Sequence, residues 1–336
     1  MNKNPLFIAL LLICVTCLFI GIFNISPTQN KIVTKKSKTK IDKLITPIAN
    51  KVAVIKLEGM ISSSSTTNFF EEDSPSVTAL QAITKAEKDE NVKGIVLCIN
   101  SPGGTVGMSQ RLYNAIYSAR QKKPVIAVMD DIAASGGYYV ASAADRIVAL
   151  PGTMTGSIGV IMSTMDFHKL LSEKLSIGEN VIKSGKYKDI GSSTRIMTTD
   201  EKKLLQDMVN DSYNQFKEAI IKGRVERNDE YNVEKTILTL EKINKYADGR
   251  VFTGRQARDY GFVDSIGGIQ SANEMMKKMV YKKFNIPENT SLDYDYNYSK
   301  SPNILKLFSA GTNENSINNF LPASMKYAGK PLYLWE

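Results

Sequence analysis

The chain has 336 residues, of which 43% are hydrophobic, and a formal net charge of +9. Residues 1–50 hold seven lysines and one aspartate, so six of the nine charges lie near the N-terminus and the remaining chain is close to neutral. This distribution argues against nucleic-acid binding and favours contact of the N-terminal lysines with anionic lipid headgroups. Cys98 is the only cysteine beyond residue 17, which excludes an intramolecular disulfide in the body of the protein.

An uncharged apolar run covers residues 5–23 and is long enough to span a bilayer as a helix. No Ala-x-Ala-like cleavage site follows it, so we expect a retained transmembrane signal anchor. Residues 1–4 would then be a short flank, and residues 24–50 a basic juxtamembrane linker. The lysines of this linker place it in the cytoplasm by the positive-inside rule, whereas the family resemblance given below implies the opposite orientation.

The body, residues 51–282, alternates predicted strands and helices. We expect strands at 51–59 and 92–100, helices at 76–90 and 106–122, and a serine-rich loop at 62–75. A buried strand from Pro124 should break at Asp130 and Asp131 and re-form as a helix after Ser135. Further strands are expected at 146–152 and 156–161, with an amphipathic surface helix around His168. Strands alternating with helices of this length predict a parallel α/β sheet with crossover connections.

The later body contains three more predicted features. Residues 180–191 should form a strand that leads into a turn, and Thr198 to Glu201 predicts a capping box that opens a long helix. The apolar stripe of this helix favours core or subunit packing over a cofactor site. Residues 248–268 predict a strand, a capped short helix and a closing turn. The chain shows no metal-ligand cluster and no nucleotide fingerprint, so we expect neither a metal nor a cofactor.

Ser135 is the candidate nucleophile. It stands in Ala134-Ser-Gly-Gly137, between the buried strand and a helix of small residues. This arrangement would push the hydroxyl out of a rigid sheet edge, at a helix N-terminus where free N–H groups stabilise an oxyanion. The alternative is that Ser135 only caps the helix, as serine often does.

A nucleophilic serine needs a general base, and histidine is a weak candidate here. His168 is the single histidine and lies in the predicted surface helix. A desolvated, neutral lysine can replace it. Three lysines lie in the strand and turn predicted at 180–191: Lys183, Lys186 and Lys188. In an extended chain the side chains of Lys186 and Lys188 point to the same face of the strand.

The glycines after the second strand provide the candidate oxyanion hole. In Asn100-Ser-Pro-Gly-Gly104, N–H groups at the strand end can point toward a substrate carbonyl. We therefore select the amides of Gly104 and of Gly136, the residue after the nucleophile. The alternative interpretation of the first motif is a plain strand-to-helix turn.

Five motifs together resemble the signal peptide peptidase A family of bacterial Ser/Lys proteases, in its short single-repeat form. They are Asn100-Ser-Pro-Gly-Gly, Ala134-Ser-Gly-Gly-Tyr-Tyr, Thr155-Gly-Ser-Ile-Gly-Val, Ser184-Gly-Lys-Tyr-Lys-Asp and Asp248-Gly-Arg-Val-Phe-Thr-Gly-Arg-Gln-Ala. The resemblance covers residues 51–282 and implies a crotonase-like α/β fold of repeated β-β-α units, related to the caseinolytic protease ClpP.

The resemblance also implies site residues. Ser135 matches the nucleophile, and Lys188 matches the general base, with Lys186 as the fallback. Ser157 matches a serine that orients the lysine, although a serine at the start of a strand is the alternative.

The implied function is degradation of cleaved signal peptides and similar apolar peptides at the bacterial inner membrane. The catalytic domain would be extracytoplasmic and would assemble as a homo-oligomeric ring, with active sites shared between protomers. A crotonase-like acyl-CoA enzyme and a non-catalytic membrane scaffold of the same fold are the alternatives.

The C-terminal tail, residues 283–336, is rich in Asn, Ser and Tyr and has an apolar end, which is typical of a flexible tether. Two further interpretations remain for its last residues: a pseudo-substrate strand in the enzyme's own groove, or an extra edge strand.

Overall fold

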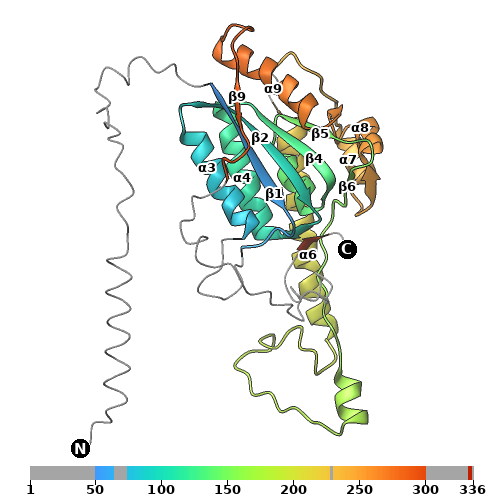
Figure 1. The fold of residues 1–336 in the computed structure, drawn as a ribbon. Helices are drawn as coiled ribbons and strands as arrows, with labels where there is room; N and C mark the ends of the chain where they lie inside the picture. Colours follow the sequence, from blue (N-terminus) through green and yellow to red (C-terminus); the bar gives the residue numbers. More distant parts are fainter. Residues whose placement is uncertain (1–49, 64–73, 228–229, 300–331, 335–336) are drawn as a thin grey trace, which may run out of the picture. The chain divides into compact units, whose positions relative to one another are not determined.

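Successive side chains of the central strands point to opposite faces of the sheet, and the apolar ones are buried on both faces. The computed structural model describes residues 50–63, 74–227, 230–299 and 332–334. The three central strands are β1 (Lys51–Glu58), β2 (Val92–Ser101) and β4 (Val125–Ala134). One set of their side chains packs with α3 (Pro75–Lys88) and α4 (Val106–Lys122), and the other packs with α9 (Ile269–Phe284). Figure 1 shows α3 and α4 on one side of the sheet and α9 on the other.

The main path of the sheet has the order β7-β6-β4-β2-β1-β9, and only the β6–β7 pair in it is antiparallel. The short outer strands are β5 (Arg146–Ala149), β6 (Met154–Gly156), β7 (Val251–Thr253), β8 (Ser265–Ile266) and β9 (Asp293–Asp295). The remaining helices are α5 (Gly136–Ala141), α6 (Thr199–Ile220), α7 (Leu240–Tyr246) and α8 (Gly254–Tyr260). The prediction of a mixed α/β fold with parallel strands is therefore confirmed.

The sheet splits along β4. The first half of β4, Ile126–Met129, pairs with β5, whereas the second half, Ile132–Ala134, pairs with β6. The predicted break at Asp130 and Asp131 is therefore wrong: the strand continues to Ala134, because a second partner takes over beyond the aspartates. This continuation carries the chain directly to Ser135.

The expected strand at 156–161 is also displaced. The strand is β6, Met154–Gly156, and it ends where Gly156 has φ of 85° and Ser157 has φ of 49°. Two successive positive φ values turn the chain out of the extended conformation, so the sheet cannot continue along 157–161.

The segment after residue 160 differs most from expectation. Residues 168–174 are helical and lie at the surface, as predicted, but the helix is short and Leu170–Lys174 form a π-helix. Residues 180–183 are exposed and do not form the predicted strand. Within the described chain no neighbouring strand pairs with them, and an unpaired strand leaves its backbone groups unsatisfied by the protein.

The described part of the C-terminal tail is not only a tether. Strand β9 pairs with β1, and β10 (Leu332–Leu334) pairs antiparallel with β3 (Gly103–Thr105). Residues 332–334 therefore form a strand, which is compatible with both the edge-strand and the pseudo-substrate interpretation. Among the residues that the structure describes, no helix is both long and apolar enough to cross a bilayer. The expected anchor, residues 5–23, lies outside the described residues.

Candidate active site

Ser135 occupies a strained turn between β4 and α5. Its backbone has φ of 52° and ψ of −115°, a region that residues with a side chain rarely adopt. The Ser135 N–H donates to the Gly156 carbonyl at 2.8 Å, and the Ser135 carbonyl accepts from the Tyr139 N–H at 2.8 Å. Both ends of the strained residue are thereby held by the sheet and the helix.

The Ser135 hydroxyl has no hydrogen-bond partner within the described chain, although it is fully buried. It makes no capping bond to α5, so the capping interpretation is wrong. A buried hydroxyl without a partner is costly, and such groups concentrate at functional sites. We expected an exposed hydroxyl; instead β10 pairs with the adjacent β3 and contacts α5, so the serine lies beneath elements that surround it.

The pairing of β3 decides which way the backbone groups of Gly104 face. Ile61 bonds to its two neighbours: the Ile61 N–H donates to the Gly103 carbonyl and the Thr105 N–H donates to the Ile61 carbonyl, both at 2.8 Å. Backbone groups alternate along a strand, so the N–H and C=O of Gly104 face the opposite edge, where Tyr333 of β10 pairs with it. A Cβ at Gly104 would lie 2.0 Å from the Ile61 carbonyl oxygen, so only glycine fits. Gly104 therefore belongs to a strand, β3, and not to a plain turn.

Gly136 is the first residue of α5. Its N–H is one of the helix N-terminal amides that have no acceptor within the helix. Because β3 contacts α5, the two predicted oxyanion donors, Gly104 and Gly136, belong to neighbouring elements beside Ser135. This arrangement is suited to binding a negatively charged oxygen formed next to the serine.

The lysines are distinguished by their partners. The Lys183 Nζ lies 2.5 Å from an Asp189 carboxylate oxygen, and the Lys186 Nζ lies 2.7 Å from one of Asp200. The hydrogen bond to Asp200 raises the pKa of Lys186, the opposite of what a general base requires. Lys188 is exposed, and its side chain makes no hydrogen bond or ion pair within the described residues.

The backbone around Lys188 is a turn in which the Lys188 N–H donates to the Gly185 carbonyl at 3.1 Å. The expectation that Lys186 and Lys188 share one face of an extended strand is therefore wrong. No hydrogen bond joins Lys188 to Ser135 in a single chain. His168 bonds through Nδ1 to Asp166 at 2.6 Å and likewise does not reach the serine.

Ser157 directly follows Gly156, whose carbonyl holds the Ser135 N–H. It follows the end of β6 and does not open a strand, which removes the alternative interpretation. The side chain is mostly buried and its N–H donates to the Arg250 carbonyl. Ser157 also lines a cavity of about 460 Å³, together with apolar residues that include Ile158, Val160 and Val209.

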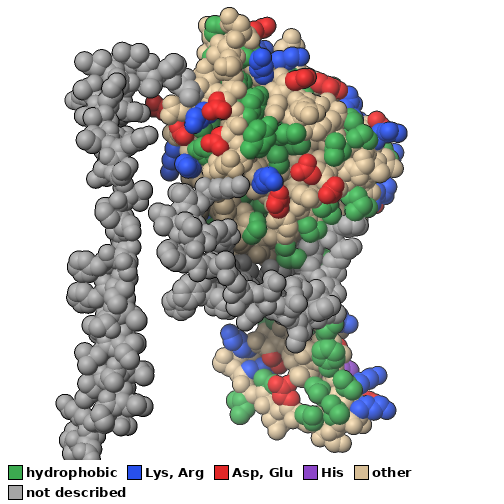
Figure 2. Space-filling view, in the orientation of Figure 1, with side chains coloured by type: hydrophobic (Ala, Val, Ile, Leu, Met, Phe, Trp, Pro, Cys, Tyr) green, Lys and Arg blue, Asp and Glu red, His purple; other side chains and the backbone are tan. Residues whose placement is uncertain are grey.

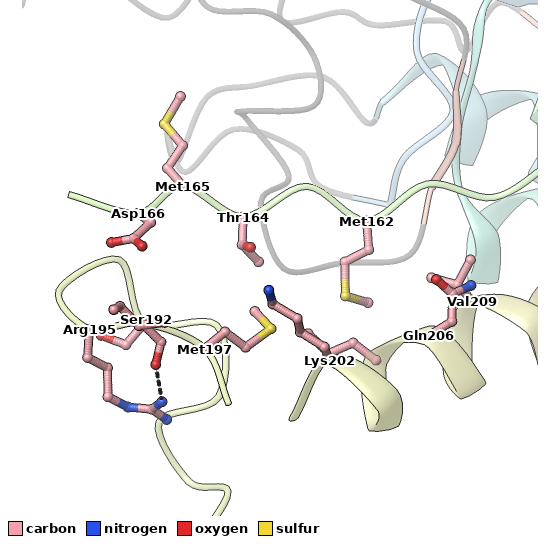
Figure 3. Close-up of a pocket in the computed structure, with 12 residues that line it drawn as sticks. Met162, Thr164, Met165, Asp166, Ser192, Arg195, Met197, Lys202, Gln206 and Val209 are labelled. Atoms are coloured by element: carbon pink, nitrogen blue, oxygen red, sulfur yellow. Dashed lines mark hydrogen bonds between the residues drawn. The ribbon is translucent and has the colours of Figure 1, made fainter. Parts of the chain in front are cut away.

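A second cavity of about 450 Å³ lies in what we call the arm, residues 161–209. Figure 3 shows Met162, Met165 and Met197 around it, with the Lys202 side chain extending toward Thr164. Both cavities are lined by Gln206 and Val209. The two cavities therefore lie on neighbouring parts of α6.

The arm exposes many large apolar side chains. Among the described residues it holds twelve of the nineteen that are exposed: Ile161, Met165, Phe167, Leu170, Leu175, Ile177, Val181, Ile182, Tyr187, Ile196, Leu204 and Met208. Figure 2 shows hydrophobic side chains over the lobe that carries the histidine. Soluble proteins rarely expose so much contiguous apolar surface unless it binds a partner.

Sequence reasoning missed a charged cluster on the arm that consists of Asp189, Arg195 and Glu201. The sequence held a signal for two of its members: Asp189 directly follows the candidate base Lys188, and Glu201 is the last residue of the predicted capping box. Among the described residues, no group of His, Cys, Asp and Glu could hold a metal ion.

Comparison with known families decides the class of the protein. Residues 118–283 match the family description Peptidase family S49, and residues 65–158 match that of Clp protease. A putative protease of Synechocystis sp. is 36% identical over 68% of this chain and 74% of its own length. The chain belongs to peptidase family S49. Membership confirms the resemblance predicted from the motifs, and with it the class of a serine-type peptidase.

Two other relatives of this S49 peptidase match over shorter fractions of their length. A putative protease of Methanocaldococcus jannaschii is 38% identical over 57% of this chain and 58% of its own length. A putative signal peptide peptidase SppA of Enterococcus faecium is 34% identical over 68% of this chain and 63% of its own length. The chain thus spans less than two thirds of these two relatives.

Proposed function

We propose that the protein is a membrane-anchored serine endopeptidase in which Ser135 is the nucleophile and Lys188 the general base. The observation that carries this proposal is Ser135 itself, which is strained, buried and without a hydrogen-bond partner in the described chain, and which precedes Gly136 in a helix that contacts the strand of Gly104. Evolution retains such strain where the geometry serves a reaction.

The chemistry follows from these groups. Neutral Lys188 accepts the Ser135 proton while the serine oxygen attacks the peptide carbonyl, and the Gly104 and Gly136 amides bind the resulting oxyanion. The Lys188 ammonium then donates its proton to the departing amine as the C–N bond breaks. Water hydrolyses the acyl-enzyme with the same groups in reversed order. Ser157, beside Ser135, would accept or donate a hydrogen bond that orients the lysine.

The proposed substrates are extended apolar peptides, including the remnants of cleaved signal peptides. Strand β10 is an internal example of a segment that pairs antiparallel with β3 opposite Gly104. An extended substrate that took the same edge would run past the oxyanion donors. The methionines and aliphatic residues of the two cavities suit apolar side chains of varied shape.

We propose further that each active site is completed by a second copy of the chain. Ser135 and Lys188 do not meet within one chain, and Lys188 is carried by an arm with an unusually apolar surface. Burial of that surface against a neighbouring chain would bring Lys188 of one chain to Ser135 of the next. Repetition of this contact would close a homo-oligomeric ring. The apolar run at 5–23 would anchor this assembly in the bacterial inner membrane, with the body outside the cytoplasm.

The direct test is hydrolysis of an internally quenched Leu/Ala-rich peptide by the full chain, beside its Ser135→Ala variant. We expect loss of at least about 10³-fold in kcat with assembly intact, because the nucleophile is removed. A serine-directed fluorophosphonate should label the parent chain and not the variant. Normal hydrolysis by Ser135→Ala would refute the mechanism. An assembled parent chain that neither hydrolyses nor labels would support the scaffold alternative.

The position of β10 leads to a second prediction. Removal of residues 329–336 should lower the apparent KM for the same peptide by roughly twofold to tenfold, because a tethered strand competes at millimolar effective concentration. A synthetic peptide of residues 329–336 added to the shortened chain should restore the competition. An unchanged KM would show that β10 is a structural edge strand that does not share the substrate path.

A further inference from the structure

The arm holds one arginine that binds two carboxylates at once. The Arg195 Nε and Nη2 atoms donate to the two carboxylate oxygens of Asp189, each at 2.8 Å. The same guanidinium donates to both carboxylate oxygens of Glu201, at 2.8 Å from Nη1 and 2.5 Å from Nη2. Bidentate bonds of this kind fix the relative orientation of the groups that they join.

The two carboxylates belong to two different parts of the arm. Asp189 directly follows Lys188 in the chain, and its carboxylate also accepts a hydrogen bond from the Lys183 ammonium at 2.5 Å. Glu201 caps α6, where it accepts from the Thr198 N–H at 2.8 Å. Arg195 therefore connects the turn that carries Lys188 to the rigid first turn of a 22-residue helix.

The cluster keeps its charges at neutral pH. The hydrogen bonds from Arg195 hold the pKa of Asp189 well below its usual range and lower the pKa of Glu201 to about 2. The Glu201 side chain is nearly buried, at 3% exposed, and the Asp189 side chain is 12% exposed. The Lys188 side chain, in contrast, has no partner in the described chain, so only the backbone can fix the position of this residue.

We propose that Arg195 is a positioning residue that holds the Lys188 backbone in place for proton transfer with Ser135 of another copy; this inference rests on the proposed function. A lysine side chain has four rotatable bonds, so its amine can be placed accurately only if its Cα is fixed. Displacement of a reacting group by about 1 Å can lower the rate by about 10²-fold. Lysine at position 195 would keep the charge but lose the fork that binds both carboxylates.

The test compares Arg195→Ala and Arg195→Lys in the full chain with the quenched peptide, and sizes each variant by light scattering. We expect kcat to fall by about 10²-fold in Arg195→Ala and to remain well below the parent value in Arg195→Lys. kcat should fall by a larger factor than KM rises, because Arg195 acts mainly on the lysine and contributes only one side chain to the lining of the arm cavity. Added guanidinium ion should restore part of the kcat of Arg195→Ala, which a general loss of folding would not permit.

The matched control is Arg258→Ala, because Arg258 also pairs with a glutamate, Glu234, at 2.9 Å but on α8. It should keep the parent kcat. Full kcat in assembled Arg195→Lys, or loss of assembly in both Arg195 variants, would overturn the positioning role. A parallel Lys188→Ala variant separates the two proposals. If it stays active, the base assignment is wrong; if it is inactive while the Arg195 variants are fully active, only the positioning role is wrong.

Discussion

We expect assemblies that mix Ser135→Ala and Lys188→Ala chains to hydrolyse peptide, although each variant alone should lose at least about 10³-fold in kcat. In a mixed ring, a Lys188→Ala chain supplies an intact serine and a neighbouring Ser135→Ala chain supplies an intact lysine. Random one-to-one mixing in a head-to-tail ring would complete about a quarter of the sites. The measurement is peptide hydrolysis by the two chains co-expressed with different affinity tags and purified through both.

The control for this experiment replaces the Lys188→Ala partner by a chain that carries both substitutions. That mixture contains no intact serine and should be inactive. If the doubly purified mixture of single variants is as inactive as this control, Ser135 and Lys188 must act within one chain. The arm would then have to rearrange relative to the structure described here, in which Lys188 makes no bond to Ser135.

Gly104→Ala should lower kcat by about 10²- to 10³-fold, the cost of losing one oxyanion donor. The added Cβ would meet the Ile61 carbonyl oxygen at 2.0 Å, and because that oxygen belongs to the backbone, β3 must move. This movement displaces the Gly104 amide from the position beside Ser135. The measurement is kcat with the quenched peptide, together with the thermal midpoint of unfolding.

Gly107→Ala is the matched control, since a Cβ at Gly107 would meet no atom within 4 Å. Gly107 lies in the first turn of α4, three residues after Gly104 in the sequence. Alanine favours a helix over glycine, so the control should be at least as stable as the parent chain and equally active. Equal activity of Gly104→Ala and Gly107→Ala would remove Gly104 from the proposed oxyanion hole.

The sequence by itself determined the features that depend on neighbouring residues. Helix α4 begins and ends where its apolar spacing predicted, and Thr198 and Glu201 form the predicted capping box. The pairs of glycines that follow β2 and Ser135 identified the candidate site, because backbone approach and positive φ are local requirements. The serine could therefore be selected without any knowledge of its surroundings.

Only the tertiary structure decided the features that depend on distant partners. The strand β4 continues past Asp130 and Asp131 because β6, twenty residues later, pairs with its second half. Lys186 is less suited to act as a base because the fold brings Asp200 to it, whereas the Lys188 side chain has no such partner among the described residues. The Arg195 cluster and the pairing of β10 with β3 likewise join segments whose contact no local pattern encodes. Spacing predicts which chemical groups a turn or helix presents, but the pairing of distant segments decides which of those groups are occupied and which stay free to react.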